Sequence, residues 1–343
     1  MRVFLTGGTG LIGSHVAERL RARGDQVVAL HRQDSDVRFL ERLGCTLARG
    51  DVRDVDALAT EMLGCDAVVH GAALVYAGES WPRVRAINVD GTTNVLLAAA
   101  LRGVPHVLHV SSVAVYARAG GAIDEDSPTD TELAPHELYA RSKREAESAA
   151  RREAEAASLK LTVVRPAAVY GERDRLLTMQ IAGLVRRPVT PVLGSGGNTL
   201  PVVYAGNVAS AIVRCLDQPP RQGSRTYDLG LDHPLTQTQL LQGIARGLGA
   251  QTRFVHVPAA LVRGGAKLGE WLGLTVPGAS DLSLARLVAL ALGDNPYASL
   301  RIRRELDWAP AFGHDEGLAR TTRWLREEWR NPGEDWNLSS RAG

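Results

Sequence analysis

The chain has little cysteine and almost no net charge, and both features exclude some classes of site and partner. Only three of its 343 residues are cysteines (Cys45, Cys65 and Cys215), an odd number without a C-x-x-C pair. A disulfide framework or a zinc site is therefore not expected, no metal is predicted, and a reducing, cytoplasmic compartment is the default. The formal net charge is +2, and nothing in the charge pattern demands a nucleic acid or an acidic membrane as a partner.

Long apolar runs are also missing. The most apolar stretch, from Leu282 to Leu292, is too short and too interrupted to span a bilayer. The N-terminus has the pattern of a strand and not that of a signal peptide. We therefore expect no membrane partner, and a small-molecule substrate is the partner that this composition leaves open.

What the sequence does contain is an alternation of short apolar strands and helical segments. Strands are predicted at 2–6, 26–30, 46–48, 66–70, 105–110 and 161–165, and helices at about 54–62, 84–102 and 136–157. This alternation predicts an α/β fold, a Rossmann-type doubly wound parallel sheet with its ligand at the carboxyl ends of the strands. Turns and helices prevail beyond Pro166, which predicts a smaller, mostly helical C-terminal substrate domain. The expected division is 1–170, with a return segment near 199–230, for the nucleotide-binding domain, and 171–198 with 231–335 for the substrate-binding part.

A glycine-rich turn follows the first strand and precedes a helical pattern. A strand, a glycine turn and a helix N-terminus predict a pyrophosphate site, because unpaired amides and the helix dipole face the anion and missing side chains allow close approach. The spacing is G-x-x-G-x-x-G, which differs from the G-x-G-x-x-G of common dehydrogenases. The residues expected to contact a dinucleotide here are Gly7, Thr9, Gly10, Leu11, Ile12 and Gly13.

Tyr139 and Lys143 lie four apart in a predicted helix, so they share one face of it. An ammonium beside a phenol favours the ionised phenol, which ordinarily forms only near pH 10. The pair Ser111-Ser112 ends the fifth predicted strand, where a hydroxyl can bond a substrate oxygen while the tyrosine moves its proton. The three side chains together predict a hydride-transfer site.

Several ordered motifs make the chain resemble the extended short-chain dehydrogenase/reductase family over nearly its whole length. The matching segments are Thr6 to Gly13, Gly50 to Val52, His70 to Ala73, Asn88 to Thr92, Ser111 to Tyr116, Tyr139 to Lys143, Arg165 to Gly171, Val203 to Ala209 and Glu305 to Pro310. The resemblance implies an NAD(P)-dependent enzyme of the epimerase/dehydratase superfamily. It also implies a homodimer in which helices 84–102 and 136–157 pair across a two-fold axis.

The resemblance also implies roles for single residues. Tyr139 resembles the general acid/base and Lys143 its ribose-binding, pKa-lowering partner, while Ser112, or else Ser111, resembles the hydroxyl that orients the substrate oxygen. Asp51 or Asn88 could equally be a turn or helix cap. The remaining cofactor contacts that the resemblance implies are Asp51 and Val52 at the adenine, Ala72 and Ala73 beneath the cofactor, and Pro166 and Val169.

Cofactor choice depends on the end of the second strand. His31-Arg32 stands there, where NAD-preferring relatives place an aspartate that accepts from the ribose hydroxyls. A basic side chain pairs with a 2′-phosphate instead, so His31 and Arg32 favour NADP over NAD. Arg32 could also be a solvated surface residue, with Asp34 or Asp36 serving a diol.

The substrate is less defined. Val113-Ala114 stands where 4,6-dehydratases of this family carry an Asp-Glu pair, and Ala167-Ala168 where nucleotide-sugar enzymes tend to carry Asn. These departures favour the branch of 3β-hydroxysteroid dehydrogenases and dihydroflavonol reductases, whose substrates are bulky alcohols and ketones. A nucleotide-sugar 4-epimerase with retained NAD and a non-catalytic dinucleotide-sensing regulator stay open as alternatives. Candidate substrate residues are Tyr76 and Tyr170 for an apolar wall, Arg173 for a diphosphate, and Asn198, although such residues are also common in plain cores and solvated faces.

Overall fold

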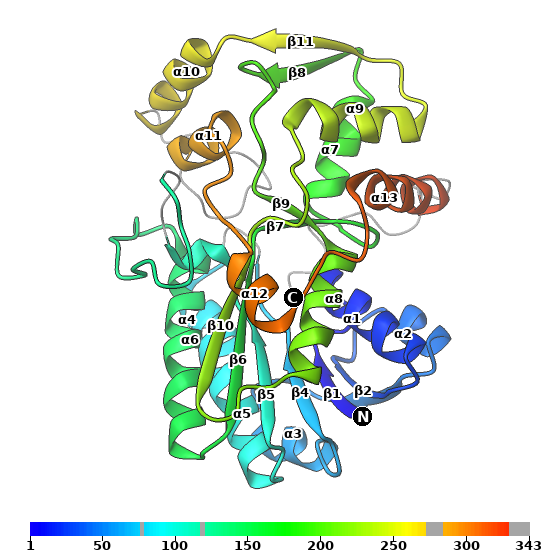
Figure 1. Cartoon of the computed structure of the whole chain (residues 1–343), viewed down its shortest axis with the longest axis vertical. Helices are drawn as coiled ribbons and strands as arrows, with labels where there is room; N and C mark the ends of the chain where they lie inside the picture. Colours follow the sequence, from blue (N-terminus) through cyan, green and yellow to red (C-terminus); the bar gives the residue numbers. More distant parts are fainter. Residues whose placement is uncertain (76–78, 117–120, 272–283, 329–343) are drawn as a thin grey trace.

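A seven-stranded parallel sheet forms the centre of the computed structural model, which describes residues 1–75, 79–116, 121–271 and 284–328. The strand order is β10-β6-β5-β4-β1-β2-β3, so the chain starts in the middle of the sheet and winds outward in both directions (Figure 1). The strands are β1 (Arg2–Thr6), β2 (Gln26–His31), β3 (Thr46–Arg49), β4 (Ala67–His70), β5 (His106–Val110), β6 (Lys160–Pro166) and β10 (Ser224–Leu229). The predicted doubly wound fold is confirmed, and the reversal of strand order between β1 and β4 is where such folds bind ligands.

Helices cover both faces of the sheet, because alternate side chains of each strand point to opposite sides. Val3 and Leu5 of β1 pack with α1 (Leu11–Ala22) and α8 (Ala205–Asp217), whereas Phe4 faces the other core. That second core is closed by α3 (Val55–Glu61), α5 (Gly91–Leu101) and α6 (Leu138–Ala156). Two apolar cores therefore fix the sheet from both sides and set where its strand ends emerge.

The helix predicted at 84–102 is not continuous. It consists of α4 (Trp81–Arg85), a π-helical turn η1 (Ala86–Asp90) and α5. Asn88 lies inside the π turn, and its side chain bonds outside the helix, to both backbone groups of Leu74. Single π turns of this kind often accompany functional sites, and this one brings a helix side chain against the loop after β4.

A second unit is built mostly from the C-terminal half, as predicted, and lies above the sheet in Figure 1. Its core is a separate apolar cluster from α7, α9 and α13, with two small parallel sheets that pair β7 with β9 and β8 with β11. Its elements are β7 (Ala168–Tyr170), α7 (Leu177–Val185), β8 (Val189–Leu193), β9 (Val202–Tyr204), α9 (Gln237–Leu248), β11 (Arg253–Val257), α10 (Ala259–Trp271), α11 (Leu284–Leu292) and α13 (His314–Glu328). The remaining short helices are α2 (Arg38–Arg42), η2 (Val113–Tyr116) and α12 (Leu300–Leu306), the last beside β10. None of the helices among the described residues is long and apolar enough to cross a membrane.

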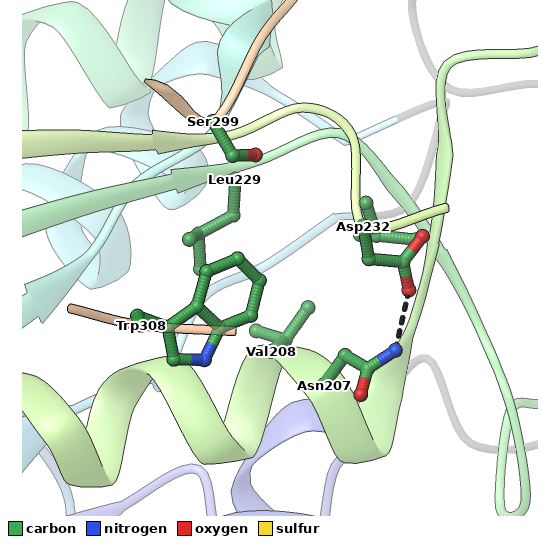
Figure 2. A pocket seen from close by; sticks show the side chains of 7 residues that line it. Asn207, Val208, Leu229, Asp232, Ser299 and Trp308 are labelled. Atoms are coloured by element: carbon green, nitrogen blue, oxygen red, sulfur yellow. Dashed lines mark hydrogen bonds between the residues drawn. The ribbon is translucent and has the colours of Figure 1, made fainter. Parts of the chain in front are cut away.

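The start of α8 ties this unit to the sheet. Asn207 donates to Asp232 at 2.8 Å and to the carbonyl of Phe312 at 2.9 Å, beside a small apolar hollow lined by Val208, Leu229 and Trp308 (Figure 2). None of the predicted site residues that the structure describes lines this hollow. These contacts connect the two units and hold the start of α8, the helix that follows β9.

Candidate active site

The glycine turn between β1 and α1 has no room for side chains. Gly7 adopts a φ of +75°, and a Cβ there would lie 2.6 Å from the carbonyl carbon of Gly71. A Cβ on Gly13 would lie 2.1 Å from the oxygen of Gly7. Gly10 precedes α1 as its N-cap and offers no side-chain cap, so the first amides of the helix are left for another acceptor. These residues fit the pyrophosphate of a dinucleotide, which helix N-termini of this kind bind.

Ser112, Tyr139 and Lys143 come together at the carboxyl end of β5. The hydroxyl of Tyr139 is hydrogen-bonded with that of Ser112. Lys143 donates to the carbonyl of Val110 at 2.8 Å, and its ammonium lies 5.8 Å from the ring centre of Tyr139. Of the two serines that the sequence offered, Ser112 thus faces the tyrosine, whereas the hydroxyl of Ser111 is buried without a hydrogen-bond partner. A phenol, a hydroxyl and an ammonium so arranged can exchange a proton with a substrate oxygen.

The electrostatics of Tyr139 and Lys143 differ from the prediction. Burial raises the pKa of Tyr139 to about 12, although the hydrogen bond with Ser112 opposes this rise. Burial also lowers the pKa of Lys143 to about 8, although the carboxylate of Glu147 opposes that fall. The expectation that the ammonium makes the phenol more acidic is therefore wrong for this structure: Lys143 is turned to the Val110 carbonyl, and the cost of a buried phenolate dominates.

Asn88 does not cap a helix; its side chain connects two segments next to the candidate site. Its amide oxygen accepts from the Leu74 amide at 2.7 Å, and its nitrogen donates to the Leu74 carbonyl at 3.0 Å and to Ser142 at 2.9 Å. It therefore links the loop after β4 to α6, the helix that carries Tyr139 and Lys143. The loop is held further by Ala72, whose amide donates to Thr6 at 3.2 Å.

The end of β2 carries both basic and acidic side chains. Arg32 is exposed there and makes no ion pair within the described part of the chain. A hydrogen bond from Arg53 has the strongest effect in lowering the pKa of the Asp51 carboxyl, and the charge of Arg32 acts in the same direction. The carboxylate of Asp36 is occupied in turn by Arg38, at 2.6 Å. Of Asp34 and Asp36, the two acids predicted as alternatives for binding a ribose diol, Asp36 is therefore already in an ion pair.

The remaining predicted cofactor residues occupy the strand ends nearby. Val52 packs so closely against Gly91 that a Cβ on that glycine would lie 2.7 Å away. Pro166 is the last residue of β6, paired with Leu229, and Val169 lies in β7, which follows directly. Among the described residues, no group of three or more His, Cys, Asp and Glu side chains is placed to hold a metal ion.

Comparisons with known proteins identify the family of this chain. Residues 3–230 match the model of the NAD dependent epimerase/dehydratase family. The chain belongs to this family. A relative from Stigmatella aurantiaca, 4-hydroxy-2-methyl-3-oxo-4-farnesyl-3,4-dihydroquinoline-1-oxide ketoreductase, is 28% identical over 93% of this chain and 95% of its own. A 3-beta-hydroxysteroid dehydrogenase from Mycolicibacterium neoaurum is 22% identical over 93% of this chain and 89% of its own.

Among solved structures, the dTDP-glucose 4,6-dehydratase DesIV from Streptomyces venezuelae, with NAD bound, superimposes with a TM-score of 0.71. The two chains are 27% identical, over 96% of this chain and 98% of DesIV. The predicted membership of the extended short-chain dehydrogenase/reductases, close to hydroxysteroid dehydrogenases, is confirmed. The protein is an enzyme of the NAD-dependent epimerase/dehydratase family.

In this epimerase/dehydratase family member, the three predicted substrate residues that the structure describes have separate surroundings. Tyr170 is 1% exposed and packs in the core of the C-terminal unit, 5.7 Å from the ring of Tyr204, so its assignment as a substrate wall is corrected to a core role. Arg173 donates to Ser14 at 2.9 Å and pairs with Glu18 at 2.7 Å, which docks it on α1. Asn198 donates to two carbonyls near the end of α11, both at 2.9 Å. Tyr76 lies outside the described residues.

Sequence reasoning missed a buried network behind the site. It joins Glu147 of α6, Arg165 of β6, Tyr116 of η2 and Asp228 of β10. The one local signal was Glu147, four residues after Lys143 and therefore on the same helix face. The other members come from distant parts of the chain, where no spacing rule applies.

Proposed function

We propose that this enzyme is an NADP-dependent reductase or dehydrogenase that acts on a bulky ketone or alcohol. The observation that carries the proposal is the meeting of Ser112, Tyr139 and Lys143 at the end of β5, beside the strand-order reversal. When bound, the nicotinamide supplies or accepts the hydride. Tyr139 holds or takes the proton of the substrate oxygen, and Ser112 orients that oxygen by its hydroxyl.

Tyr139 is protonated at neutral pH, which is the form that carbonyl reduction requires. A phenol with a pKa of about 12 is protonated at neutral pH, so it is ready to donate to a carbonyl oxygen as that oxygen gains charge. Lys143, with a pKa of about 8, is then mostly charged and can stabilise the phenolate that results.

The two residues directly after Ser112 support the substrate class. Val113 and Ala114 provide no carboxyl for an elimination step, which disfavours dehydration. The similar ketoreductase from S. aurantiaca and the similar 3-beta-hydroxysteroid dehydrogenase are both named for bulky, mainly apolar substrates. A nucleotide-sugar 4-epimerase with retained NAD is the second candidate, because the family as named includes epimerases.

One experiment separates the two candidates. The purified protein is incubated with NADPH and a steroid ketone, and in parallel with a UDP-sugar, while nicotinamide absorbance is followed. We expect net NADPH oxidation with the ketone and no nucleotide retained on purification. Tightly held NAD, together with UDP-sugar conversion at constant absorbance, would establish the epimerase instead.

Arg32 is the residue on which the cofactor preference depends. We expect Arg32→Asp to weaken NADPH binding by about 10- to 100-fold, because it removes a charged hydrogen-bond donor of the 2′-phosphate. Binding of NADH should improve or stay constant, since the new carboxylate can accept from the ribose hydroxyls. Fluorescence titration with each nucleotide measures both constants, and Arg246→Asp on the distant α9 is the control for the charge change. Equal weakening of both nucleotides would contradict the proposal.

The remaining assignments are also proposals. We propose a cytoplasmic enzyme with a nucleotide-binding domain at 1–170, a return segment near 199–230, and a substrate part at 171–198 and 231–335. A homodimer through α5 and α6 is supported by Leu97 and Leu101 of α5, whose exposed fractions are 40% and 66%. Light scattering of the purified protein at several concentrations tests this state.

A further inference from the structure

Lys143 shares its burial with a carboxylate on its own helix. Lys143 is 3% exposed and Glu147, one turn further along α6, is 5% exposed. Desolvation alone favours the neutral amine, and the charge of Glu147 acts in the opposite direction. Two ionisable side chains of opposite charge are thus buried together one helical turn apart.

Glu147 is held in place by an arginine from the sheet. Arg165 on β6 donates to both oxygens of Glu147, from Nε at 2.8 Å and from Nη2 at 2.6 Å. Arg151 approaches the same carboxylate only at 3.7 Å and from a more exposed position. Bidentate pairs of this kind fix both the orientation and the ionised state of the carboxylate.

The arginine is fixed in turn from its far side. Its Nη1 donates to the hydroxyl of Tyr116 at 2.7 Å, and that hydroxyl donates to Asp228 at 2.6 Å. Asp228 is fully buried on β10, in register with Arg165 on β6. The cluster therefore links α6, β6, η2 and β10 behind Lys143.

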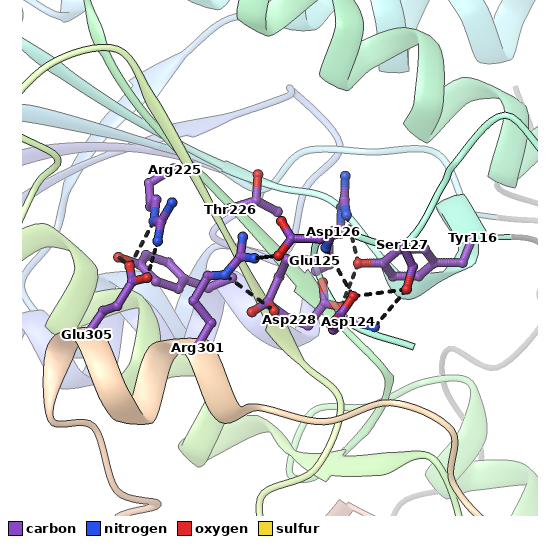
Figure 3. Close-up of polar contacts among 12 residues, drawn as sticks. Tyr116, Asp124, Glu125, Asp126, Ser127, Arg225, Thr226, Asp228, Arg301 and Glu305 are labelled. Atoms are coloured by element: carbon purple, nitrogen blue, oxygen red, sulfur yellow. Dashed lines mark hydrogen bonds and ion pairs between the residues drawn. The ribbon is translucent and has the colours of Figure 1, made fainter. Parts of the chain in front are cut away.

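A more exposed layer closes the cluster. The amide of Asp228 donates to Glu125 at 2.9 Å, and Arg301 of α12 pairs with Glu125 at 3.6 Å and with Asp126 at 2.5 Å (Figure 3). Arg225 and Glu305 form a further pair beside it. Residues of the C-terminal half thus shield the inner charges from water, which strengthens their effect on one another.

Apart from Glu147 and its partner Arg165, the titratable groups of β4, β5 and α6 that face Lys143 carry no charge at neutral pH. His70 on β4 and His109 on β5 are buried, and burial lowers the pKa of His70 to about 3 and that of His109 well below its usual value. Tyr139 on α6 is protonated. Among the described residues, the ionised group whose field supports the Lys143 ammonium is therefore Glu147.

We propose that Glu147 is a positioning residue for the reaction: its buried carboxylate, clamped by Arg165 and the Tyr116–Asp228 pair, keeps the ammonium of Lys143 charged beside Tyr139. The inference rests on the role of Lys143 in the proposed function. Its consequence is a pH dependence, because Lys143 loses its charge as the pH rises through its pKa.

The test uses the double variant Glu147→Gln/Arg165→Gln, which removes both charges and keeps hydrogen-bonding amides in their place. The readouts are kcat/KM and the dissociation constant of NADPH, each measured against pH. In each pH profile we expect an alkaline limb, the range at high pH where kcat/KM falls or NADPH binding weakens as Lys143 loses its proton. Without Glu147 the pKa of Lys143 falls, so the alkaline limb of both profiles should move to lower pH by about one unit. Above the limb this corresponds to about a tenfold loss of kcat/KM relative to the wild type, and below it to no loss.

Two further variants make the outcome unambiguous. Glu145→Gln makes the same change on the exposed Arg141–Glu145 pair of the same helix and should leave the limb unmoved. Glu147→Asp keeps the negative charge but moves it away from Lys143 by one methylene group. Its alkaline limb should therefore also shift to lower pH, but by less than in the double variant. This variant replaces the double variant in the test if the double variant does not fold. A limb that stays in place in whichever of the two Glu147 variants folds overturns the inference. A wild-type enzyme without any alkaline limb in either readout would instead refute the role of Lys143 in the proposed function.

Discussion

Tyr139→Phe is expected to lower kcat for carbonyl reduction by about 10²- to 10⁴-fold, the usual contribution of a positioned general acid. The phenol is the donor that meets Ser112 at the end of β5, and phenylalanine fills the same space without a proton to give. Steady-state kinetics with NADPH and a steroid ketone measure the loss. The dissociation constant of NADPH should change little, because the glycine turn that fits the pyrophosphate lies on β1 and α1 and is not altered.

The serine pair supplies the matched control for this prediction. Ser112→Ala should also lower kcat, because it removes the hydroxyl that contacts Tyr139. Ser111→Ala should leave kcat near the wild-type value, since the Ser111 hydroxyl is buried without a partner in the protein. Turnover that persists in Tyr139→Phe would show that another group moves the proton.

Glu147→Gln alone is expected to lower the free energy of unfolding by about 3–5 kcal/mol, the usual cost of leaving one partner of a buried ion pair uncompensated. Arg165 is 5% exposed, and its two donors to Glu147 lie at 2.6 and 2.8 Å, so its charge would lose its counter-ion without gaining water. Denaturant unfolding followed by circular dichroism measures the change.

The exposed pair on the same helix is the control for stability as well. Arg141 and Glu145 also lie four apart, at 2.9 Å, but their side chains are 50% and 37% exposed. Glu145→Gln should therefore cost no more than about 1 kcal/mol. The double variant Glu147→Gln/Arg165→Gln should be more stable than Glu147→Gln, because no unpaired cation is left behind. A single variant as stable as Glu145→Gln would mean that water or another group compensates Arg165.

These two expectations concern different properties of one helix. Tyr139, Lys143 and Glu147 follow each other at intervals of four along α6, which places a half-buried phenol, a buried ammonium and a buried carboxylate on one face. Tyr139 and Lys143 are proposed to act on the substrate and the cofactor, and Glu147 is proposed to act on Lys143. Kinetic measurements therefore test the catalytic role of this helix face, and unfolding measurements test the ion pair that stabilises it.

Much of this arrangement could be predicted from local patterns. The strand Arg2–Thr6 has the bounds that its apolar run predicted, and the glycines after it lie in a turn that excludes side chains. The spacing of Tyr139 and Lys143 correctly placed them on one helix. Such features depend on chain geometry over a few residues, which is the same wherever the segment packs.

Predictions that depended on orientation were less successful. The ammonium of Lys143 was expected to act on Tyr139, yet it is turned to Val110, and burial decides the pKa of the phenol. Tyr170 was expected at the substrate, yet the C-terminal unit covers it. Lys143 lies on the predicted helix, and in both cases the surroundings of the residue come from other parts of the chain.

The sequence by itself determined the doubly wound sheet, the glycine turn and the family, because periodicity, glycine spacing and ordered motifs are local properties. Only the tertiary structure decided which serine faces Tyr139, how far burial shifts the tyrosine and lysine pKa values, and that Glu147 is clamped by a network whose members Tyr116 and Asp228 lie 112 residues apart. Desolvation and charge pairing depend on every group that packs around an atom, and those groups become neighbours only when the chain has folded.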